Sequence, residues 1–537
     1  MIESLLSGVS TLAECDSQLA QIPSSLEKCR RRCWLETESK TDTIETSTGN
    51  VLNESINSSE LFLASVVKVY CTSTAPNFHM PWQMLSQTNC TSSGFVISTH
   101  PSKRWIMGNA HGATHPTNIR ICKHGDVTKY VARVLHIGHE CDLVLLTVDD
   151  EQFWIGLQEL SFGYLPRLQE TVVVAGYPTG GDNLSVTKGV VSRVTISTYS
   201  HSLEQLLTIQ IDAAINMGNS GGPCIQGTHV VGVAFQGIAQ SQNIGYIIPV
   251  PIIFHFLDDI DIHSCYTGFP RLAFDWTPME NKSIREYFAI PPNKHGILVN
   301  GIERACLISQ VLRKNDVITS IDGIPLGDDG TIHFRRGERI SFRSIEKSKF
   351  IDEEISLSVI RDNRELTITC SLDSNPTTVP YHLHDQLPQY IIYAGIVFTP
   401  LTRSYLKAYA TSEWYRCAFA FGITNLIDYV LNRTLLKQEK DEQIIILSQI
   451  LVDTINNGYT SSCHNKRLFK VNNVEIKTMK QMNEVLEGLL ANDLVEYIRF
   501  ELENDGLIVI SKAEAKQANE RILKQNNIVY EKSKDLI

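Results

Sequence analysis

The hexapeptide Gly218-Asn219-Ser220-Gly221-Gly222-Pro223 is the stretch that decides the fold of this chain. Nucleophilic acyl transfer needs an exposed hydroxyl with backbone N–H groups beside it that face the developing oxyanion. Glycines on both sides of the serine allow a tight turn, because glycine tolerates positive φ and leaves room for a substrate. The pattern predicts that Ser220 is a nucleophile and that the N–H groups of Gly218 and Ser220 form an oxyanion hole. For the stretch taken alone, the alternative is a plain glycine-rich turn between two strands.

A serine nucleophile requires a base and an acid that orients the base, and the sequence supplies both upstream. The strand-like run Trp105-Ile106-Met107-Gly108-Asn109-Ala110 ends in His111, and Asp142 precedes the apolar run Leu143-Val144-Leu145-Leu146. The order His111, Asp142, Ser220 is that of chymotrypsin-type proteases, whereas subtilisins and α/β-hydrolases have other orders. We predict that Asp142 accepts from Nδ1 of His111 and that Nε2 of His111 takes the proton of Ser220.

Other histidines and acids near these positions fit ordinary structural roles. Asp212, just before the nucleophile loop, is open to two interpretations: a residue that positions the loop, or a satisfied structural carboxylate. Cys29 and Cys33 are a pair without partners, and no cysteines or histidines have zinc spacing, so neither a metal nor a cofactor is expected. The histidines interpreted as surface or strand residues are His115, His124, His136 and His139.

Several segments together resemble the HtrA/Deg family of serine proteases. The chain has Asn109-Ala110-His111, then Asp-Leu-Val-Leu-Leu at 142–146, and Asp-Ala-Ala-Ile-Asn-Met-Gly-Asn-Ser-Gly-Gly-Pro at 212–223. It departs from the family pattern at Gly108, where threonine is usual, but glycine there removes no catalytic atom. The resemblance runs from about residue 60 to the C-terminus, and its later part is similar to plant members with two PDZ domains that are found in the nucleus and nucleolus. The further matching segments are 232–236, 243–249, 266–270, 315–318, 322–323, 334–340 and 393–398.

The resemblance implies a mainly β fold, in which a chymotrypsin-like double β-barrel protease domain is followed by two PDZ-like α+β domains. Short strand-like runs separated by turns between Leu61 and about Asp261 agree with a barrel or sandwich. The expected division is a flexible N-terminal extension at 1–60, a trypsin-like serine protease domain at 61–262, a first PDZ domain at 263–375, and a divergent PDZ-like domain with a helical insertion at 376–537.

Periodicity and turn residues predict individual elements. The strands expected in the first half are 62–70, 94–98, 104–110, 130–137, 143–148, 171–175, 186–195, 206–211 and 229–235. A short helix is expected at 251–257, a tight turn at Asp322-Gly323, a helix at 342–350, and a hairpin of 355–360 with 365–369. The C-terminal part is expected to hold strands at 390–398, 443–452, 467–471, 497–502 and 507–511, helices at 412–436 and 479–490, and a helix with a frayed end after residue 512.

The resemblance also assigns binding residues. In the family the S1 pocket is shaped by positions that match Ile215, Asn243, Ile244 and Gly245. No acid lies there, which favours a small or medium apolar P1 residue; Ile215 is equally suited to the core. The loop Tyr266-Thr267-Gly268-Phe269 resembles the carboxylate-binding loop of a PDZ domain, which captures a peptide as an added strand. The alternative for this loop is a strand start with a core tyrosine and phenylalanine.

Composition limits the environment and the partners. The 13 cysteines among 537 residues are odd in number and form no framework, which favours reduced thiols inside a cell. The net charge of −11 argues against a general nucleic-acid surface. No run reaches the roughly 18 apolar residues that a membrane span needs. No secretory signal is visible, and the acids within residues 1–60 disfavour a transit peptide.

We therefore expect an ATP-independent serine endopeptidase that acts on misfolded or regulatory proteins, because no phosphate-binding loop is present. The resemblance implies regulation by PDZ domains, a homo-oligomer that is a trimer or a multiple of trimers, and a nuclear or nucleolar location, with the cytoplasm as the alternative. Partners are protein or peptide substrates, without nucleic acid or membrane. The alternative function is a peptide-binding scaffold or chaperone with a resting-state protease domain.

Overall fold

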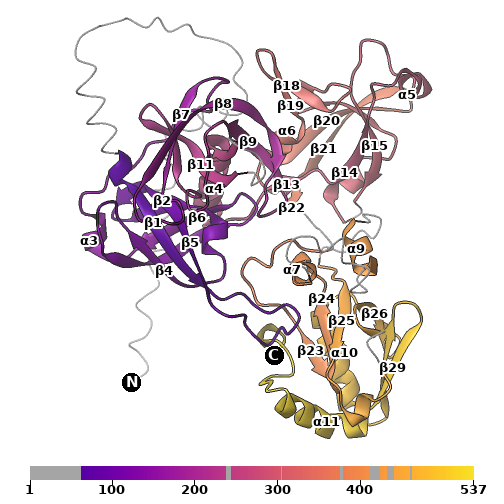
Figure 1. Cartoon of the computed structure of the whole chain (residues 1–537). Coiled ribbons are helices and arrows are strands. Elements are labelled where there is room, and N and C mark those ends of the chain that lie inside the picture. The colour runs from indigo at the N-terminus through magenta and orange to yellow at the C-terminus, as the bar shows by residue number, and fades with distance from the viewer. Residues whose placement is uncertain are drawn as a thin grey trace, which may run out of the picture.

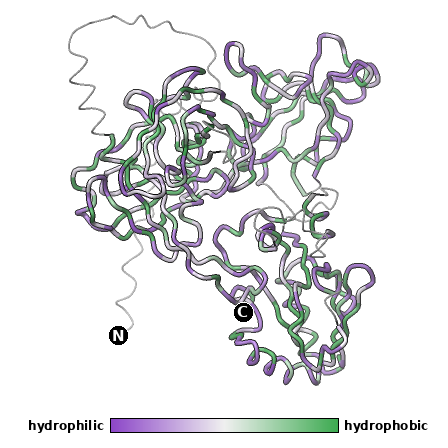
Figure 2. The backbone as a smooth tube through the Cα atoms, in the orientation of Figure 1, coloured by the Kyte–Doolittle hydropathy of each residue, from purple (hydrophilic) through white to green (hydrophobic). Residues whose placement is uncertain are grey.

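The computed structural model describes residues 62–237, 244–303, 305–374, 379–409, 424–431, 441–459 and 463–537. The predicted extension at 1–60 lies outside these residues. Figure 1 shows a double barrel in indigo to magenta, a second unit in salmon and a C-terminal unit in orange and yellow. In Figure 2 apolar residues run along the strands inside each unit and hydrophilic residues along the outer loops, so each unit has an apolar interior. None of the described helices is long and apolar enough to cross a membrane.

The first half of the chain forms two closed six-stranded barrels, which confirms the predicted double barrel. The first closes in the order β1-β2-β3-β6-β5-β4, with β1 (Val66–Ser73), β2 (Thr88–His100), β3 (Lys103–Gly108), β4 (Pro116–Cys122), β5 (Lys129–Gly138) and β6 (Leu143–Val148). The second closes in the order β10-β11-β12-β9-β8-β7, with β7 (Thr171–Gly176), β8 (Ser185–Thr198), β9 (Gln205–Ile211), β10 (Pro223–Gln226), β11 (His229–Gly237) and β12 (Gly245–Pro249). Between them lies the short helix α3 (Glu151–Trp154).

The strands that the sequence analysis missed are polar or short. β4 begins with Pro116 and the polar residues Thr117 and Asn118. β2 is extended at its start by an exposed polar run that pairs with β1 as far as Ser73. The apolar alternation by which strands are recognised is confined to Ile119 and Ile121 in β4 and is missing from the start of β2. The predicted helix at 251–257 is longer than expected: α4 (Val250–His263) buries Ile252, Ile253 and Phe256 against the second barrel.

The second unit is an antiparallel sheet with two short helices. Its strands follow the order β14 (Phe274–Pro278), β15 (Ile297–Ile302), β16 (Val317–Ile321), β20 (Glu354–Arg361) and β21 (Arg364–Ser371), and its helices are α5 (Lys282–Tyr287) and α6 (Arg343–Lys347). The predicted Asp322-Gly323 turn is confirmed: both residues have positive φ, and they join β16 to β17 (Ile324–Pro325). One apolar cluster joins this sheet to the second barrel, so the two units share a core.

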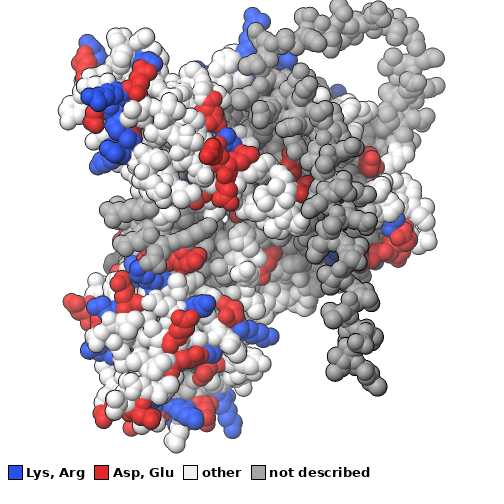
Figure 3. All heavy atoms as spheres, turned by 180° about the vertical axis from the view of Figure 1, so that it is seen from behind, with Lys and Arg blue, Asp and Glu red and all other residues white. Residues whose placement is uncertain are grey.

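The C-terminal unit is a second antiparallel sheet flanked by helices. Its strands follow the order β23 (Ile391–Tyr393), β24 (Ile396–Pro400), β25 (Ile445–Ile450), β26 (Lys466–Val471), β28 (Tyr497–Leu502) and β29 (Gly506–Ser511). Its helices include α7 (Arg403–Lys407), α9 (Thr424–Leu431), α10 (Met479–Ala491) and α11 (Lys512–Gln525). Of the predicted helix at 412–436, only 424–431 lies within the described residues. Seen from behind, acidic and basic side chains are interspersed over this unit (Figure 3), so this face carries charge of both signs.

Two predictions for the C-terminal unit are wrong. The strand expected at 390–398 is a hairpin, because the chain turns at Ala394 and Gly395, both with positive φ. A side chain on Gly395 would meet the carbonyl oxygen of Leu451. The segment after residue 512 does not end as a frayed helix: beyond α11 it returns to the sheet, where the Ser533 N–H donates to the Tyr390 carbonyl at 3.0 Å. That contact anchors the end of the chain.

Candidate active site

The predicted nucleophile lies on a crowded turn that only glycine permits on both sides. Gly218 has φ 97° and Gly221 has φ 86°, in the region that side chains rarely adopt. A side chain on Gly218 would meet the Tyr177 carbonyl oxygen, and one on Gly221 would meet that of Ser93. The loop between β9 and β10 therefore presents Ser220 in one backbone conformation.

His111 and Asp142 form a doubly hydrogen-bonded pair. His111 lies on the short helix η1 (Ala110–Ala113) directly after β3, and Asp142 precedes β6 with φ 55°. Asp142 Oδ1 accepts from the backbone N–H of His111 at 2.8 Å, and Oδ2 lies 2.7 Å from His111 Nδ1. The carboxylate is 1% exposed, whereas the imidazole is 36% exposed. The acid thus fixes the ring and leaves Nε2 available.

The charge of Asp142 sets the protonation of His111. Burial by itself lowers the pKa of His111, but the negative charge and the hydrogen bond of Asp142 outweigh it. The pKa of His111 is therefore raised above its ordinary value. Such a shift stabilises the imidazolium that forms when the histidine takes a proton.

Ser220 does not bond to the base in this conformation. Among the described residues, its hydroxyl donates to the Phe235 carbonyl at 3.3 Å and makes no hydrogen bond to His111. The backbone N–H groups of Gly218 and Ser220 likewise donate to no partner among the described residues, whereas those of Gly221 and Gly222 bond to Ala234 and Asn219. Two unpaired N–H groups beside a serine are what an oxyanion hole needs.

Ser93, which the sequence analysis missed, connects the first barrel to the nucleophile loop of the second. Its hydroxyl donates to the Gly218 carbonyl at 2.7 Å and accepts from the Tyr177 N–H at 2.8 Å. Its own N–H donates to the Ser220 carbonyl at 2.8 Å. The side chain is fully buried, so it fixes the loop relative to His111. No motif marks a serine in a strand for this role.

The predicted substrate-pocket residues are only partly described. Asn243 lies outside the described residues. The side chain of Ile215 lies close against Gly245: a Cβ atom added to this glycine would be 2.8 Å from Ile215 Cδ1. Ile215 is half-buried and also contacts the core of the second barrel, and Ile244 is half-buried beside Gly245. Asp212, the other open assignment, accepts from the Val190 N–H at 2.6 Å through Oδ1, which ties the residues before the nucleophile loop to β8.

The predicted peptide-binding loop is engaged within the chain. Asp259 of α4 accepts from the N–H of Thr267 at 2.5 Å, from its hydroxyl at 2.7 Å, and from the N–H of Gly268 at 3.3 Å. The ring of Phe269 stacks on His255 at 4.1 Å, and that of Tyr266 meets Phe256 edge-on. A peptide carboxylate would have to replace Asp259 to reach these groups.

Cys90 is a reactive-thiol candidate beside the base. It lies opposite Cys71 in the pairing of β1 with β2, and all nine cysteines within the described residues are free. A hydrogen bond from the Cys71 thiol lowers the pKa of Cys90 below its ordinary value, and the nearby His111 lowers it further. Cys90 is exposed, and it is the thiolate form that reacts.

Iodoacetamide at pH 7 is therefore expected to modify Cys90 several-fold faster than the exposed Cys265 of the same chain, because more of Cys90 is thiolate at that pH. Mass spectrometry of peptides sampled over time measures both rates in one reaction. Equal rates, or faster modification of Cys265, would contradict the lowered pKa.

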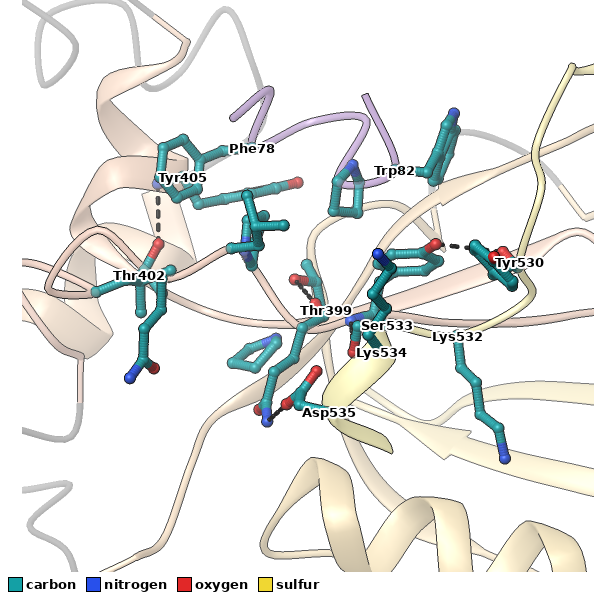
Figure 4. Close-up of a pocket in the computed structure, with 18 of the residues that line it drawn as sticks. Phe78, Trp82, Thr399, Thr402, Tyr405, Tyr530, Lys532, Ser533, Lys534 and Asp535 are labelled. Carbon is teal, nitrogen blue, oxygen red and sulfur yellow. Dashed lines mark hydrogen bonds between the residues drawn. The ribbon is translucent and has the colours of Figure 1, made fainter. Parts of the chain in front are cut away.

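A cavity of about 870 Å³ lies at the junction of the first barrel and the C-terminal unit. The loop between β1 and β2 reaches this unit, and Gln449 Nε2 donates to the His79 carbonyl at 2.7 Å. Figure 4 shows Phe78 and Trp82 of that loop on one side of the cavity and Ser533, Lys534 and Asp535 of the C-terminal segment on the other. None of the triad residues lines it.

Two family models match the chain. A trypsin-like peptidase domain matches residues 92–233, a range that contains His111, Asp142 and Ser220. A PDZ domain matches residues 379–535, which include the C-terminal sheet.

Curated relatives match almost all of the chain. The mitochondrial Do-like 3 protein of Arabidopsis thaliana is 41% identical over 89% of this chain and 81% of its own length. Protease Do-like 2 of the same plant, named as chloroplastic, is 39% identical over 89% of this chain and 76% of its length. Protease Do-like 4, named as mitochondrial, is 40% identical over 88% of this chain and 86% of its length. The solved HtrA-type protease AlgW with a decapeptide is 21% identical, covers 60% of this chain and 99% of that one, and has a TM-score of 0.46.

The predicted nuclear or nucleolar location is wrong. The three Arabidopsis relatives described above are named as mitochondrial or chloroplastic. The prediction relied on likeness in segments such as 334–340 and 393–398, and a shared fold is a weak guide to location.

Proposed function

Because this chain belongs to the HtrA/Deg family of serine proteases and is a serine endopeptidase, we propose that it cleaves peptide bonds through Ser220, His111 and Asp142. The observation that carries the proposal is the pair of hydrogen bonds that Asp142 accepts from His111, one from the backbone N–H and one from Nδ1. The bond to Nδ1 fixes the tautomer in which Nε2 accepts a proton.

In the proposed reaction His111 acts first as a base and then as an acid. Nε2 of His111 removes the proton of Ser220 as Oγ attacks the scissile carbonyl, and the N–H groups of Gly218 and Ser220 stabilise the oxyanion. His111 then gives the proton to the leaving amine, and water hydrolyses the acyl-enzyme. Before attack, the Ser220 hydroxyl must leave the Phe235 carbonyl. The conformation described is thus a resting form in this proposal.

The pH dependence of peptide hydrolysis tests the proposed base. Protonated His111 cannot accept the serine proton, so kcat/KM should fall as the pH falls through the pKa of His111. Because that pKa is raised, the acid limb should lie above about pH 6.5, the ordinary value for histidine. Cleavage of a chromogenic peptide across pH 5 to 9 in buffers of constant ionic strength measures it, roughly the range that covers histidine titration. An acid limb below pH 6, roughly half a unit under the ordinary value, would contradict the assignment.

We propose proteins and peptides with a small or medium apolar P1 residue as substrates, cleaved without ATP. The packing of Ile215 on Gly245 supports an apolar wall beside the nucleophile loop. The proposed division of the chain is a protease domain at 61–262, a first PDZ-like domain at 263–375 and a second at 376–537, after an extension at 1–60. The two antiparallel sheets and the PDZ match at 379–535 support the last two.

We further propose that the chain forms a homo-oligomer, a trimer or a multiple of trimers, as the family resemblance implies. Sedimentation velocity of the full chain at micromolar concentration should give a mass of at least three times 60.3 kDa. The specific activity should fall on dilution if assembly is needed for catalysis. A monomer with constant specific activity at every concentration would contradict the proposal.

A further inference from the structure

Three histidines that are far apart in the sequence converge beside His111. His139 follows β5, His201 lies between β8 and β9, and His382 precedes β23. Each offers one ring nitrogen, and the three nitrogens lie within 4.8 Å of one another. The residues come from both barrels and from the segment that leads into the C-terminal unit.

The contacts orient one nitrogen of His139 toward the cluster and the other toward a carboxylate. His139 Nδ1 lies 3.0 Å from His201 Nε2, and His139 Nε2 lies 3.3 Å from Asp385 Oδ2. His139 is 1% exposed, and its Nε2 has no hydrogen bond of good geometry among the described residues. With its proton on Nε2, facing the Asp385 carboxylate, His139 keeps a lone pair on Nδ1, which faces the cluster. Many metal-ligating histidines are oriented in this way.

The rings of the three histidines also pack against one another. The rings of His201 and His382 are 4.6 Å apart, and those of His139 and His382 stack at 5.2 Å. Neutral imidazoles are the form that binds metal.

We propose that His139, His201 and His382 bind one divalent transition-metal ion, with zinc as the best fit. Three imidazoles with a fourth position open to water form an ordinary zinc donor set, and the lack of cysteine or hard oxygen donors disfavours iron–sulfur, calcium and magnesium sites. Asp385 orients His139 rather than binding the ion. Because Nδ1 of His139 keeps the lone pair, Nε2 of His201 donates the hydrogen bond between them. When the ion binds, that proton moves to Nδ1 of His201, two metal–nitrogen bonds replace the hydrogen bond, and no oxidation or reduction occurs.

The ion would connect the barrels to the segment before β23. Asp385 Oδ1 also accepts from the N–H of His115 at 3.1 Å, and His382 Nε2 lies 2.7 Å from the His201 carbonyl oxygen. The ring of His201 is 6.2 Å from that of His111. A dication so close disfavours a positively charged His111, so zinc should slow any reaction that passes through the His111 imidazolium. Metal binding itself does not depend on the proposed peptidase chemistry.

Zinc binding to the full chain, stripped with EDTA, tests the proposal. Competition with a chromophoric chelator should give about one site per chain. His382→Ala and His201→Ala should each weaken binding by at least about 100-fold, and Asp385→Asn by about 10- to 100-fold, the range found when an orienting partner of a ligand is lost. His333→Ala, which removes an exposed histidine of β18 (Thr331–Arg335), should leave the affinity unchanged.

Cobalt gives a second readout that does not depend on activity. Co²⁺ in this site should show the visible bands of a four-coordinate ion without thiolate charge-transfer bands, and His382→Ala should abolish them. Circular dichroism of each metal-free variant checks folding. If His382→Ala is unfolded, His201→Ala is used in its place. The proposal is overturned if no stoichiometric site is found, if His382→Ala binds like His333→Ala, or if thiolate bands appear.

Discussion

Replacing Ser220 with alanine is expected to lower kcat for peptide hydrolysis by about 10⁴-fold or more. The substitution removes only Oγ and its 3.3 Å hydrogen bond to the Phe235 carbonyl, so the fold should remain. The oxyanion N–H groups and the base stay in place, but no atom is left to form the acyl-enzyme. Cleavage of unfolded β-casein without ATP by wild type and variant measures the difference.

Ser161→Ala is the matched control for this substitution, because Ser161 is exposed on the same domain and should cleave like wild type. A fluorophosphonate probe adds a direct readout: it should attach to Ser220 in wild type and to no serine of the variant. Equal cleavage by wild type and Ser220→Ala would refute the assignment of the nucleophile.

Replacing Asp142 with asparagine is expected to lower kcat by about 10⁴-fold while the backbone keeps its course. Asparagine tolerates the positive φ of this position as well as aspartate does. It can still accept from the His111 N–H, but its side chain no longer compels the tautomer with a proton on Nδ1. The charge that raises the pKa of His111 is also lost, so the acid limb of the residual activity should move to lower pH.

Asp149→Asn is the matched control, since Asp149 is exposed and, among the described residues, pairs with Arg133 at the barrel surface. Single-turnover and steady-state rates of both variants on one chromogenic peptide give the comparison. Activity of Asp142→Asn within tenfold of wild type, or an unchanged acid limb, would show that another group orients His111.

The sequence was sufficient where a side chain's role depends on its immediate neighbours. Glycines around Ser220, a small residue before His111 and an acid before a buried strand each have a local physical reason, so the three candidates and the double barrel could be predicted. Ser93, His201 and His382 could not, because what they do depends on partners 60 or more residues away. The hairpin at Ala394-Gly395 was missed since the surrounding run is apolar throughout and hides the turn.

Asp259 has a consequence for how selective the proposed first PDZ-like domain can be. Its carboxylate occupies the N–H groups of Thr267 and Gly268, and it belongs to the same chain. A tethered ligand on a short connection has an effective concentration of about millimolar or higher. A free chain end at micromolar concentration, roughly a thousandfold lower, cannot displace it through its terminal carboxylate alone. Discrimination among incoming peptides would then rest on the side chains that precede the terminus, because every polypeptide carries the same final group.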